Sequence, residues 1–177
     1  MDYKLPKRIE NSNKSTYGRV LNIAGSDYMS GAAYLSSVSA LKIGCGYCFL
    51  CSTERVIDAV AAKTQNIVFV PYSKLLENLK TADVVEIGCG LSQEPIAVEV
   101  FNTVIENIPQ STKLLIDADG LNILSKNPNK FMKRSLASVI LTPHPKEASR
   151  LLGISLDEVL ADVENSTKKI SQKYNST

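Results

Sequence analysis

Two short polar runs, each placed directly after an apolar stretch, are the residues of this chain best suited to chemistry. The first is Asp117-Ala118-Asp119-Gly120-Leu121-Asn122, and the second is Thr142-Pro143-His144-Pro145-Lys146-Glu147. In open parallel α/β sheets, ligands bind outside the carboxyl ends of the strands. If both apolar stretches are strands of one such sheet, the two runs contribute to one site.

The side chains of these runs each allow two interpretations. On extended backbone Asp117 and Asp119 would face the same way and could share a proton, bind a divalent ion or hold ligand hydroxyls. Alternatively, one Asp caps a short segment that starts at Gly120, and the other is solvated. His144 is the only histidine, and its two flanking prolines stiffen the loop so that it could aim the imidazole. A surface histidine without a role is the alternative.

Two glycine-bounded loops could also meet a ligand. Gly25-Ser26 follows an apolar run and leads through Gly31-Ala32-Ala33 into a predicted helix, whose free N–H groups could bind an anionic or carbonyl-bearing group. A tight turn without a ligand explains the same residues. Gly88-Cys89-Gly90 follows a second apolar run, and its missing side chains would let a ligand touch the backbone. Neither loop has the Walker A pattern or the full dinucleotide-binding glycine pattern.

Cys45, Cys48 and Cys51 have the spacing that opens a bacterial iron–sulfur motif. The fourth Cys and the Pro of that motif are missing, because Arg55 and Val56 stand there. Residues three apart on a strand point to opposite faces, so converging thiolates are not expected. We predict no metal and instead reduced, buried thiols that pack as small apolar groups.

The elements that must position these residues alternate between short β-rich apolar runs and stretches of helical periodicity, which is typical of a parallel α/β sheet. A helix over 31–41, ending at Gly44, joins the first two strands. The expected strands are 20–24, 47–51, 67–70, 84–87, 114–116 and 139–141.

Two later helices also have clear start signals. One has Pro95 in its first turn, and the other begins with Ser155 as N-cap and Glu158 three residues on, a capping box, and continues toward Tyr174. Such a helix normally leads to another strand. The sequence ends at Thr177, so we expect a sheet truncated on its C-terminal side; a helix that closes the domain is the alternative.

Length and composition predict one domain. The 177 residues are 44% apolar, with a polar lead-in over 1–17 and one folded unit over 18–177. The net charge of +2 comes from scattered lysines, which does not indicate a nucleic-acid partner. The sequence contains neither an N-terminal signal region nor 18 consecutive apolar residues, so we expect no membrane partner and a cytoplasmic location.

In order and spacing, these segments resemble the ADP- or ATP-dependent NAD(P)H-hydrate dehydratases, a family with a ribokinase-like fold. The resemblance covers nearly all of the chain, and the Asp-Ala-Asp-Gly-Leu-Asn and Thr-Pro-His-Pro motifs are specific when found together. It implies an α/β, ribokinase-like, mostly parallel sheet with helices on both faces. The segments are Gly25-Ser26 with Gly31-Ala32-Ala33, Ile87-Gly88-Cys89-Gly90-Leu91, 117–122 and 142–147.

The resemblance implies a lyase that repairs nicotinamide nucleotides. Hydrated NADH or NADPH is phosphorylated on its ring hydroxyl by ADP or ATP, and phosphate then leaves, with Mg²⁺ accompanying the nucleotide. By motif match, Ala32, Gly88 or Gly90, and His144 would contact the hydrated substrate, and the Gly25-Ser26 turn would form the wall. The residues that would line the cleft toward the nucleotide are Asp117, Asp119 and Asn122.

This chain departs from the family pattern in ways that bear on activity. The family's Lys-Gly strand, glycine-rich anion loop and catalytic Asp have no counterpart within 177 residues, so we expect the chain alone to be inactive and assign no catalytic residue. Cys89 and Ser92 stand where the family usually has Pro and Gly. Glu86 interrupts a usually apolar strand and is expected to face solvent or the missing half, because burying it without a partner would be costly.

Two further functions stay open beside the repair enzyme. One is a non-catalytic dinucleotide-binding protein that lacks the donor site, and the other is a ribokinase-like kinase of a small hydroxymethyl compound, against which the Asp-Ala-Asp-Gly motif argues. In each case a truncated sheet would expose an edge strand and an apolar face. We therefore predict a homo-oligomer or a partner that supplies the rest of the fold.

Overall fold

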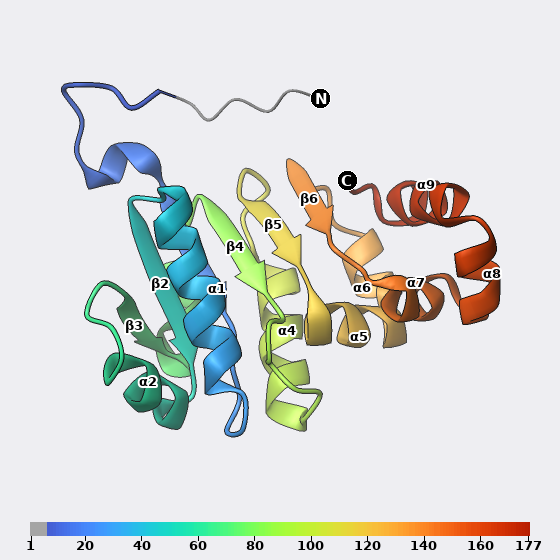
Figure 1. Cartoon of the computed structure of the whole chain (residues 1–177), viewed down its shortest axis with the longest axis horizontal. Helices are drawn as coiled ribbons and strands as arrows, with labels where there is room; N and C mark the ends of the chain where they lie inside the picture. Colours follow the sequence, from blue (N-terminus) through green and yellow to red (C-terminus); the bar gives the residue numbers. More distant parts are fainter. Residues whose placement is uncertain (1–6) are drawn as a thin grey trace.

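The computed structural model describes residues 7–177 and contains a six-stranded sheet in the order β3-β2-β1-β4-β5-β6. Every neighbouring pair is parallel, so all the carboxyl ends lie at one edge (Figure 1). The six predicted strands are confirmed, with ends that differ by one residue at most. They are β1 (Arg19–Ile23), β2 (Tyr47–Ser52), β3 (Val68–Pro71), β4 (Val84–Ile87), β5 (Lys113–Ile116) and β6 (Ser138–Leu141).

Helices connect the strands and cover the sheet unequally. A 3-10 turn, η1 (Lys14–Tyr17), precedes β1, so the predicted irregular lead-in is partly ordered; residues 1–6 lie outside the described part. The remaining elements are α1 (Ser30–Ile43), α2 (Glu54–Ala61), η2 (Tyr72–Lys74), α3 (Leu75–Leu79), α4 (Pro95–Asn107), α5 (Ala118–Lys126), α6 (Pro128–Met132), α7 (Pro145–Leu152), α8 (Leu156–Ala161) and α9 (Val163–Tyr174).

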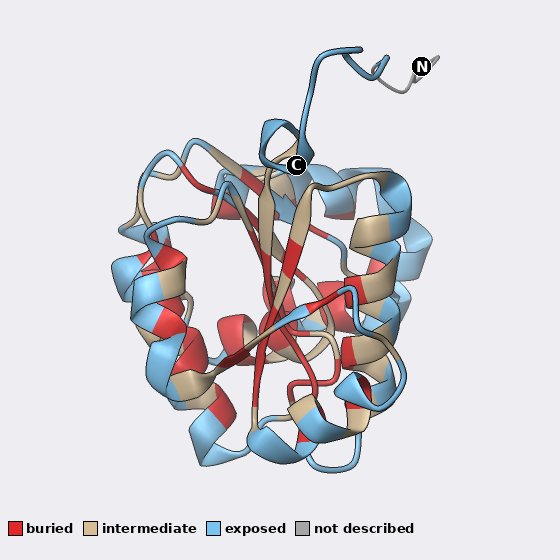
Figure 2. Ribbon diagram, turned by 90° about the vertical axis from the view of Figure 1, so that its left-hand side faces the viewer, coloured by how far each residue is buried: buried red, intermediate tan, exposed pale blue. Residues whose placement is uncertain are grey.

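Side chains of a strand alternate between its two faces, and here the faces carry separate cores. The smaller core joins Leu50 and Ile67 to α1 and α2. The larger core covers the other face with residues of α3 to α9. Figure 2, which views the molecule from the β3 side, shows helices on both sides with buried residues turned toward the strands. The sheet is thus flanked by helices on both faces, as predicted.

The face that carries α1 is open over β4, β5 and β6. In register on this face lie Asn22, Glu86, Leu115 and Ile140. Their exposure rises along the row: Asn22 is fully buried, Glu86 and Leu115 are half-buried, and Ile140 is 42% exposed. Figure 1 shows why, because α1 and α2 cover only the β1–β3 side, and no other described helix lies in front of β4–β6.

Helix ends follow the sequence signals at three places. Gly44 adopts the left-handed conformation (φ 113°) and its N–H donates to Ala40 and Leu41 carbonyls, which ends α1. Pro95 occupies the first turn of α4. Ser155 and Glu158 form the predicted capping box of α8.

The single helix predicted from Ser155 toward Tyr174 is wrong, because the chain breaks at Asp162. This residue has φ −151° and ψ 80°, and its carboxylate accepts from Asn165 N–H, so it caps a new helix, α9. After α9, Thr177 N–H donates to Val139 O and Thr177 O accepts from Leu141 N–H. These two bonds have the pattern of a parallel ladder beside β6.

Two of the three cysteines with iron–sulfur-like spacing are buried as predicted, whereas Cys45, which precedes β2, is only half-buried. Cys48 and Cys51 of β2 are free and fully buried, and Cys51 belongs to the larger core on the face opposite α1. Burial raises the pKa of each thiol to about 12. Both are therefore protonated at neutral pH.

Candidate functional site

The loops after β1, β4 and β5 pack together at the carboxyl edge of the sheet. Gly25 N–H donates to Cys89 O (2.9 Å), which joins the β1 and β4 loops. Gly88 has φ 130°, and a Cβ there would lie 1.9 Å from Asp117 O of the β5 loop. A Cβ at Gly90 would lie 2.7 Å from the Ala32 Cβ at the start of α1. Close packing between loops therefore requires these glycines, which are themselves buried.

Asp117 and Asp119 do not lie together on extended backbone, so the first of the two interpretations is wrong. Asp117 is the N-cap of α5, and its Oδ1 accepts from Ala118 N–H (2.8 Å). Ala118 has φ 47°, and the helix begins there rather than at Gly120. The capping alternative holds for Asp117, but Asp119 is not simply solvated, since it lies in the first turn of α5 and binds neighbouring groups.

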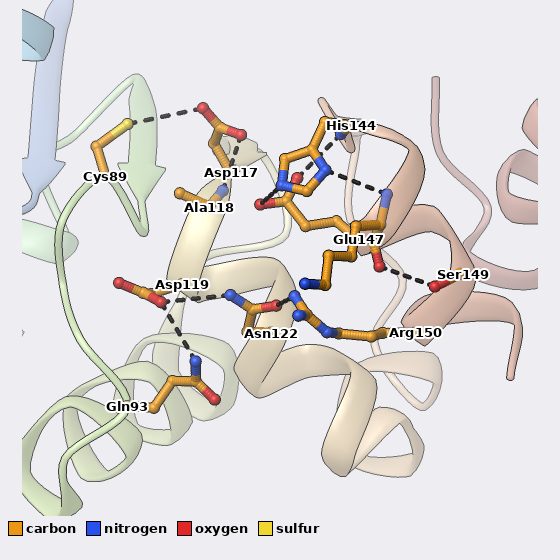
Figure 3. Close-up of polar contacts among 11 residues, drawn as sticks. Cys89, Gln93, Asp117, Ala118, Asp119, Asn122, His144, Glu147, Ser149 and Arg150 are labelled. Carbon is orange, nitrogen blue, oxygen red and sulfur yellow. Dashed lines mark hydrogen bonds and ion pairs between the residues drawn. The ribbon is translucent and has the colours of Figure 1, made fainter. Parts of the chain in front are cut away.

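The carboxylate of Asp119 is the centre of a hydrogen-bond network that joins three elements (Figure 3). Its Oδ2 accepts from Ser92 N–H (2.9 Å), and its Oδ1 accepts from Asn122 Nδ2 (3.3 Å) and Gln93 Nε2 (3.4 Å). Asn122 Oδ1 in turn accepts from Arg150 Nη1 of α7 (2.6 Å). We call Ser92, Gln93, Asp119, Asn122 and Arg150 the Asp119 network.

His144 is exposed and caps α7. Its Nδ1 accepts from Lys146 N–H (3.1 Å), so the ring proton resides on Nε2, which points at Glu147 Oε1 (3.3 Å). Glu147 is only 5% exposed, and its Oε2 accepts from His144 N–H (2.9 Å). Pro145 occupies the first helical turn. The imidazole is therefore held in one tautomer and one orientation.

Cys89, Glu86 and Asp117 form a small acidic cluster beside the glycine loop. The Cys89 thiol donates to Glu86 Oε1 (3.3 Å) and lies 3.8 Å from Asp117 Oδ2. Burial, and then the neighbouring Asp117 charge, raise the pKa of Glu86, while the Cys89 hydrogen bond opposes that shift. Burial and the two carboxylates raise the pKa of Cys89 as well. The thiol is thus a hydrogen-bond donor at neutral pH.

Two hollows lie on either side of the Gly88-Cys89-Gly90 loop. One, of about 390 Å³, is lined by Gly25, Ser26, Tyr28, Leu91 and Ser92 among others. The other is a shallow groove of about 480 Å³ on the open sheet face, and the residues that line it are Ser36, Ser39, Ala40, Ile43, Glu86, Leu115, Asp117 and Thr142. Of the predicted site residues, Gly25 and Ser26 line the first hollow and Asp117 lines the second. The others line neither hollow: Ala32, Gly88, Gly90, Asp119, Asn122 and His144.

Three residues of the site, Ser92, Glu147 and Arg150, were given no role in it by the sequence analysis. Ser92 adopts a left-handed backbone conformation (φ 70°), which is unfavourable for any residue other than glycine. Glu147 stands three residues after His144, which is the capping-box spacing and could have identified it. Arg150 has no local sequence signature, because its partner Asn122 lies on another helix.

Within residues 7–177, no group of three or more His, Cys, Asp or Glu side chains is arranged to hold a metal ion. The Asp119 carboxylate already accepts three N–H groups. Within the same range, no helix is both long and apolar enough to cross a membrane.

Residues 20–177 match the family model of the NAD(P)H-hydrate dehydratases. A bifunctional NAD(P)H-hydrate repair enzyme of Coxiella burnetii is 34% identical over 174 residues, covering 96% of this chain and 34% of that protein. An ADP-dependent (S)-NAD(P)H-hydrate dehydratase of Listeria monocytogenes is 30% identical over 158 residues, covering 88% of this chain and 56% of that protein.

Solved structures show the same fold. An ADP/ATP-dependent NAD(P)H-hydrate dehydratase from Bacillus subtilis, co-crystallised with ATP and Mg²⁺, aligns with a TM-score of 0.82 and 27% identity over 97% of this chain and 60% of that chain. A ribokinase-like superfamily protein of Enterococcus faecalis aligns with a TM-score of 0.86 at 23% identity, over 98% and 60% of the two chains. The ribokinase-like fold is thus confirmed. The chain spans about a third to 60% of the length of these proteins.

Proposed function

The chain belongs to the NAD(P)H-hydrate dehydratase family, and we propose that it forms the dinucleotide-binding part of the ADP- or ATP-dependent dehydration of (S)-NAD(P)H hydrate. In that reaction the ring hydroxyl oxygen takes the terminal phosphoryl group of the nucleotide. The C–O bond then breaks, phosphate leaves, and loss of a ring proton restores the double bond of NAD(P)H.

One observation carries this proposal. The Gly88-Cys89-Gly90 loop, the 117–122 run and the 142–147 run come together at the carboxyl ends of the adjacent strands β4, β5 and β6. This is where parallel α/β sheets bind ligands. The relatives named NAD(P)H-hydrate dehydratases match this chain across the same residues.

An elongated ligand such as a dinucleotide could occupy both hollows, which we call the Gly25-Ser26 hollow and the Asp117 groove after residues that line them. The Gly25-Ser26 hollow and the Asp117 groove are separated by one loop, whose Cys89 contacts Gly25 through its backbone and Asp117 through its side chain. We propose that the hydrated nicotinamide lies against this loop, near Ala32 and within reach of the oriented His144 imidazole. The rest of the dinucleotide then extends along a hollow.

In this proposal Asp119 and Asn122 do not contact the ligand directly but hold neighbouring protein groups in place. Their polar atoms are occupied within the Asp119 network. The described residues also do not form a Mg²⁺ site by themselves. We propose that binding of ADP or ATP with Mg²⁺ requires groups other than these, so that the 177-residue chain alone binds the dinucleotide but does not turn it over.

The open face of β4–β6 supports a related proposal. Ile140 is 42% and Ile43 is 72% exposed there, and apolar groups of this size gain from being covered. We propose that the chain associates with itself or with another polypeptide segment over this face, and that it acts in the cytoplasm.

The test is to measure binding of NADPH hydrate and of ADP to the 177-residue chain by calorimetry, together with formation of NADPH by near-ultraviolet absorbance. We expect hydrate binding, weak or absent ADP binding and no turnover. Ala32→Leu should weaken hydrate binding roughly tenfold, because the larger side chain would push the closely packed Gly90 loop out of place. Ala61→Leu, on the exposed surface of α2, should not weaken it. A wild-type chain that binds no dinucleotide would contradict the proposal.

A further inference from the structure

Arg150 is connected to the glycine loop only through other side chains. It projects from α7 and is exposed, and its Nη1 donates to Asn122 Oδ1 on α5 at 2.6 Å (Figure 3). Asn122 Nδ2 then donates to Asp119, whose other oxygen accepts from Ser92 N–H. The hydrogen bonds therefore converge on the Asp119 carboxylate, from α7 through Asn122 on one side and from Ser92, at the end of the glycine loop, on the other.

The chemistry of the donors and acceptors sets the orientation of the amide in the middle of this network. A guanidinium can only donate, an ionised carboxylate can only accept, and the side-chain amide between them has one end of each kind. Arg150 therefore obliges Asn122 to present its oxygen to α7 and its NH₂ group to Asp119. If Arg150 were removed, the amide would be free to turn, and its oxygen would then face a carboxylate that offers no proton.

The far end of this series is a strained backbone position. Ser92 has φ 70°, a left-handed conformation that is unfavourable for a non-glycine residue. Its N–H is held by Asp119 at 2.9 Å. Ser92 follows Gly90 by two residues, and Gly90 packs against Ala32 and Met29. The Asp119–Ser92 hydrogen bond therefore anchors the C-terminal end of the Gly88-Cys89-Gly90 loop, next to the contacts of Gly90.

We propose that Arg150 is a positioning residue: by orienting the Asn122 amide it keeps Asp119 on the Ser92 N–H and so holds the glycine loop in the shape that receives the dinucleotide. The role in binding rests on the proposed function, whereas the role in loop geometry does not. Arg150 lies on the surface and does not belong to either core. Its removal should leave the fold intact.

The experiment compares Arg150→Met with Arg150→Lys and with Lys168→Met in the 177-residue chain. Lys168 is a matched control, because it is an exposed helical cation on α9 whose one side-chain hydrogen bond, to Glu164, lies outside the Asp119 network. Two readouts are used: the amide resonance and hydrogen-exchange rate of Ser92 by NMR, and the Kd for NADPH hydrate by calorimetry.

In Arg150→Met the Ser92 resonance should move upfield and its exchange should accelerate, because the carboxylate no longer holds that N–H steadily. The Kd should rise roughly tenfold, the size expected for coupling within one hydrogen-bond network. Arg150→Lys, which still donates, should keep most of both properties, and Lys168→Met should keep them entirely.

An unchanged Ser92 resonance in Arg150→Met, or an equal change in Lys168→Met, would overturn the proposal. If the wild-type chain binds no NADPH hydrate, the proposed function fails, while the Ser92 resonance still decides whether Arg150 positions the loop.

Discussion

The strands β4, β5 and β6 present one packed face and one open face, and the two are made from alternate residues of the same short segments. On the packed face, Val85, Leu114 and Val139 are at most 6% exposed under the helices of the larger core. On the open face, Glu86 and Leu115 are half-buried and Ile140 is 42% exposed. Alternate residues of the same strands therefore lie in a buried apolar core on one face and in a partly exposed surface on the other.

Under the proposed function, this half of the sheet uses its packed face for stability and its open face for binding. The packed face removes apolar area from water and holds the strands in register. The open face leads directly to the Asp117 groove and the glycine loop. Substitutions on the two faces should therefore change different measured quantities, and the following experiments test that separation from the largest expected effect to the smallest.

Adjacent leucines on β5 give the sharpest comparison. Leu114→Ala should lower the free energy of unfolding by about 2–5 kcal/mol, because it leaves a cavity in the larger core. Leu115→Ala removes the same atoms from the half-buried open face and should cost less than half as much. Urea unfolding followed by circular dichroism measures both, and equal losses would mean that the open face is covered in solution.

Gly88, which follows β4 and packs against the β5 loop, tests the close contact between the two loops. Gly88→Ala should cost about 2–4 kcal/mol, because its Cβ would collide with Asp117 O at 1.9 Å and its φ is 130°. Gly31→Ala is the matched control, since a Cβ at Gly31 meets nothing within 4 Å and Ala favours the helix. The prediction is contradicted if both variants melt at the wild-type temperature.

The Asp119 network should contribute less to stability than either packing site. Asp119→Ala leaves the Ser92 N–H and the Asn122 amide without their acceptor and should cost about 1–3 kcal/mol. Asp58→Ala, an exposed Asp on α2, should stay within about 0.5 kcal/mol of wild type. Chemical unfolding of both variants checks this, and a neutral Asp119→Ala would show that the network does not hold the loop.

The smallest expected change in the free energy of unfolding is an increase, and it comes from Glu86 on the open face. Burial raises the pKa of Glu86 above its ordinary 4.5, so the folded chain binds this proton more tightly than the unfolded chain. The stability that Glu86 contributes is complete below pH 4.5 and is lost as the pH rises through the raised folded value. Glu86→Gln should therefore raise the free energy of unfolding at pH 7 by about 0.5 kcal/mol.

The same substitution should also flatten the pH dependence of stability above pH 4.5. Glu99→Gln, on the exposed surface of α4, serves as the control and should change neither quantity. A Glu86→Gln chain that is less stable than wild type at pH 7 would mean that the Glu86 carboxylate is stabilised by its neighbours rather than strained by burial.

Much of the fold follows from local pattern. Apolar runs of three to five residues separated by helical stretches were sufficient to predict all six strands, because the strands of a parallel sheet are largely covered by the connecting helices. Gly44, Pro95 and the Ser155–Glu158 pair marked helix ends through backbone chemistry that acts within a few residues. The break at Asp162 was missed, since an Asp inside an amphipathic stretch reads equally well as a solvated residue.

The site was predictable in composition but not in geometry. The sequence by itself determined which loops follow the strand ends, and hence that Gly88, Asp117 and His144 lie at one edge of the sheet. Only the tertiary structure decided that Asp119 and Asn122 bind the β4 loop and Arg150 rather than standing free, and that Glu86 meets the Cys89 thiol. The reason is physical: caps and alternation depend on neighbours within a few residues, whereas a side chain that joins separate elements acquires its partner only when the chain has folded.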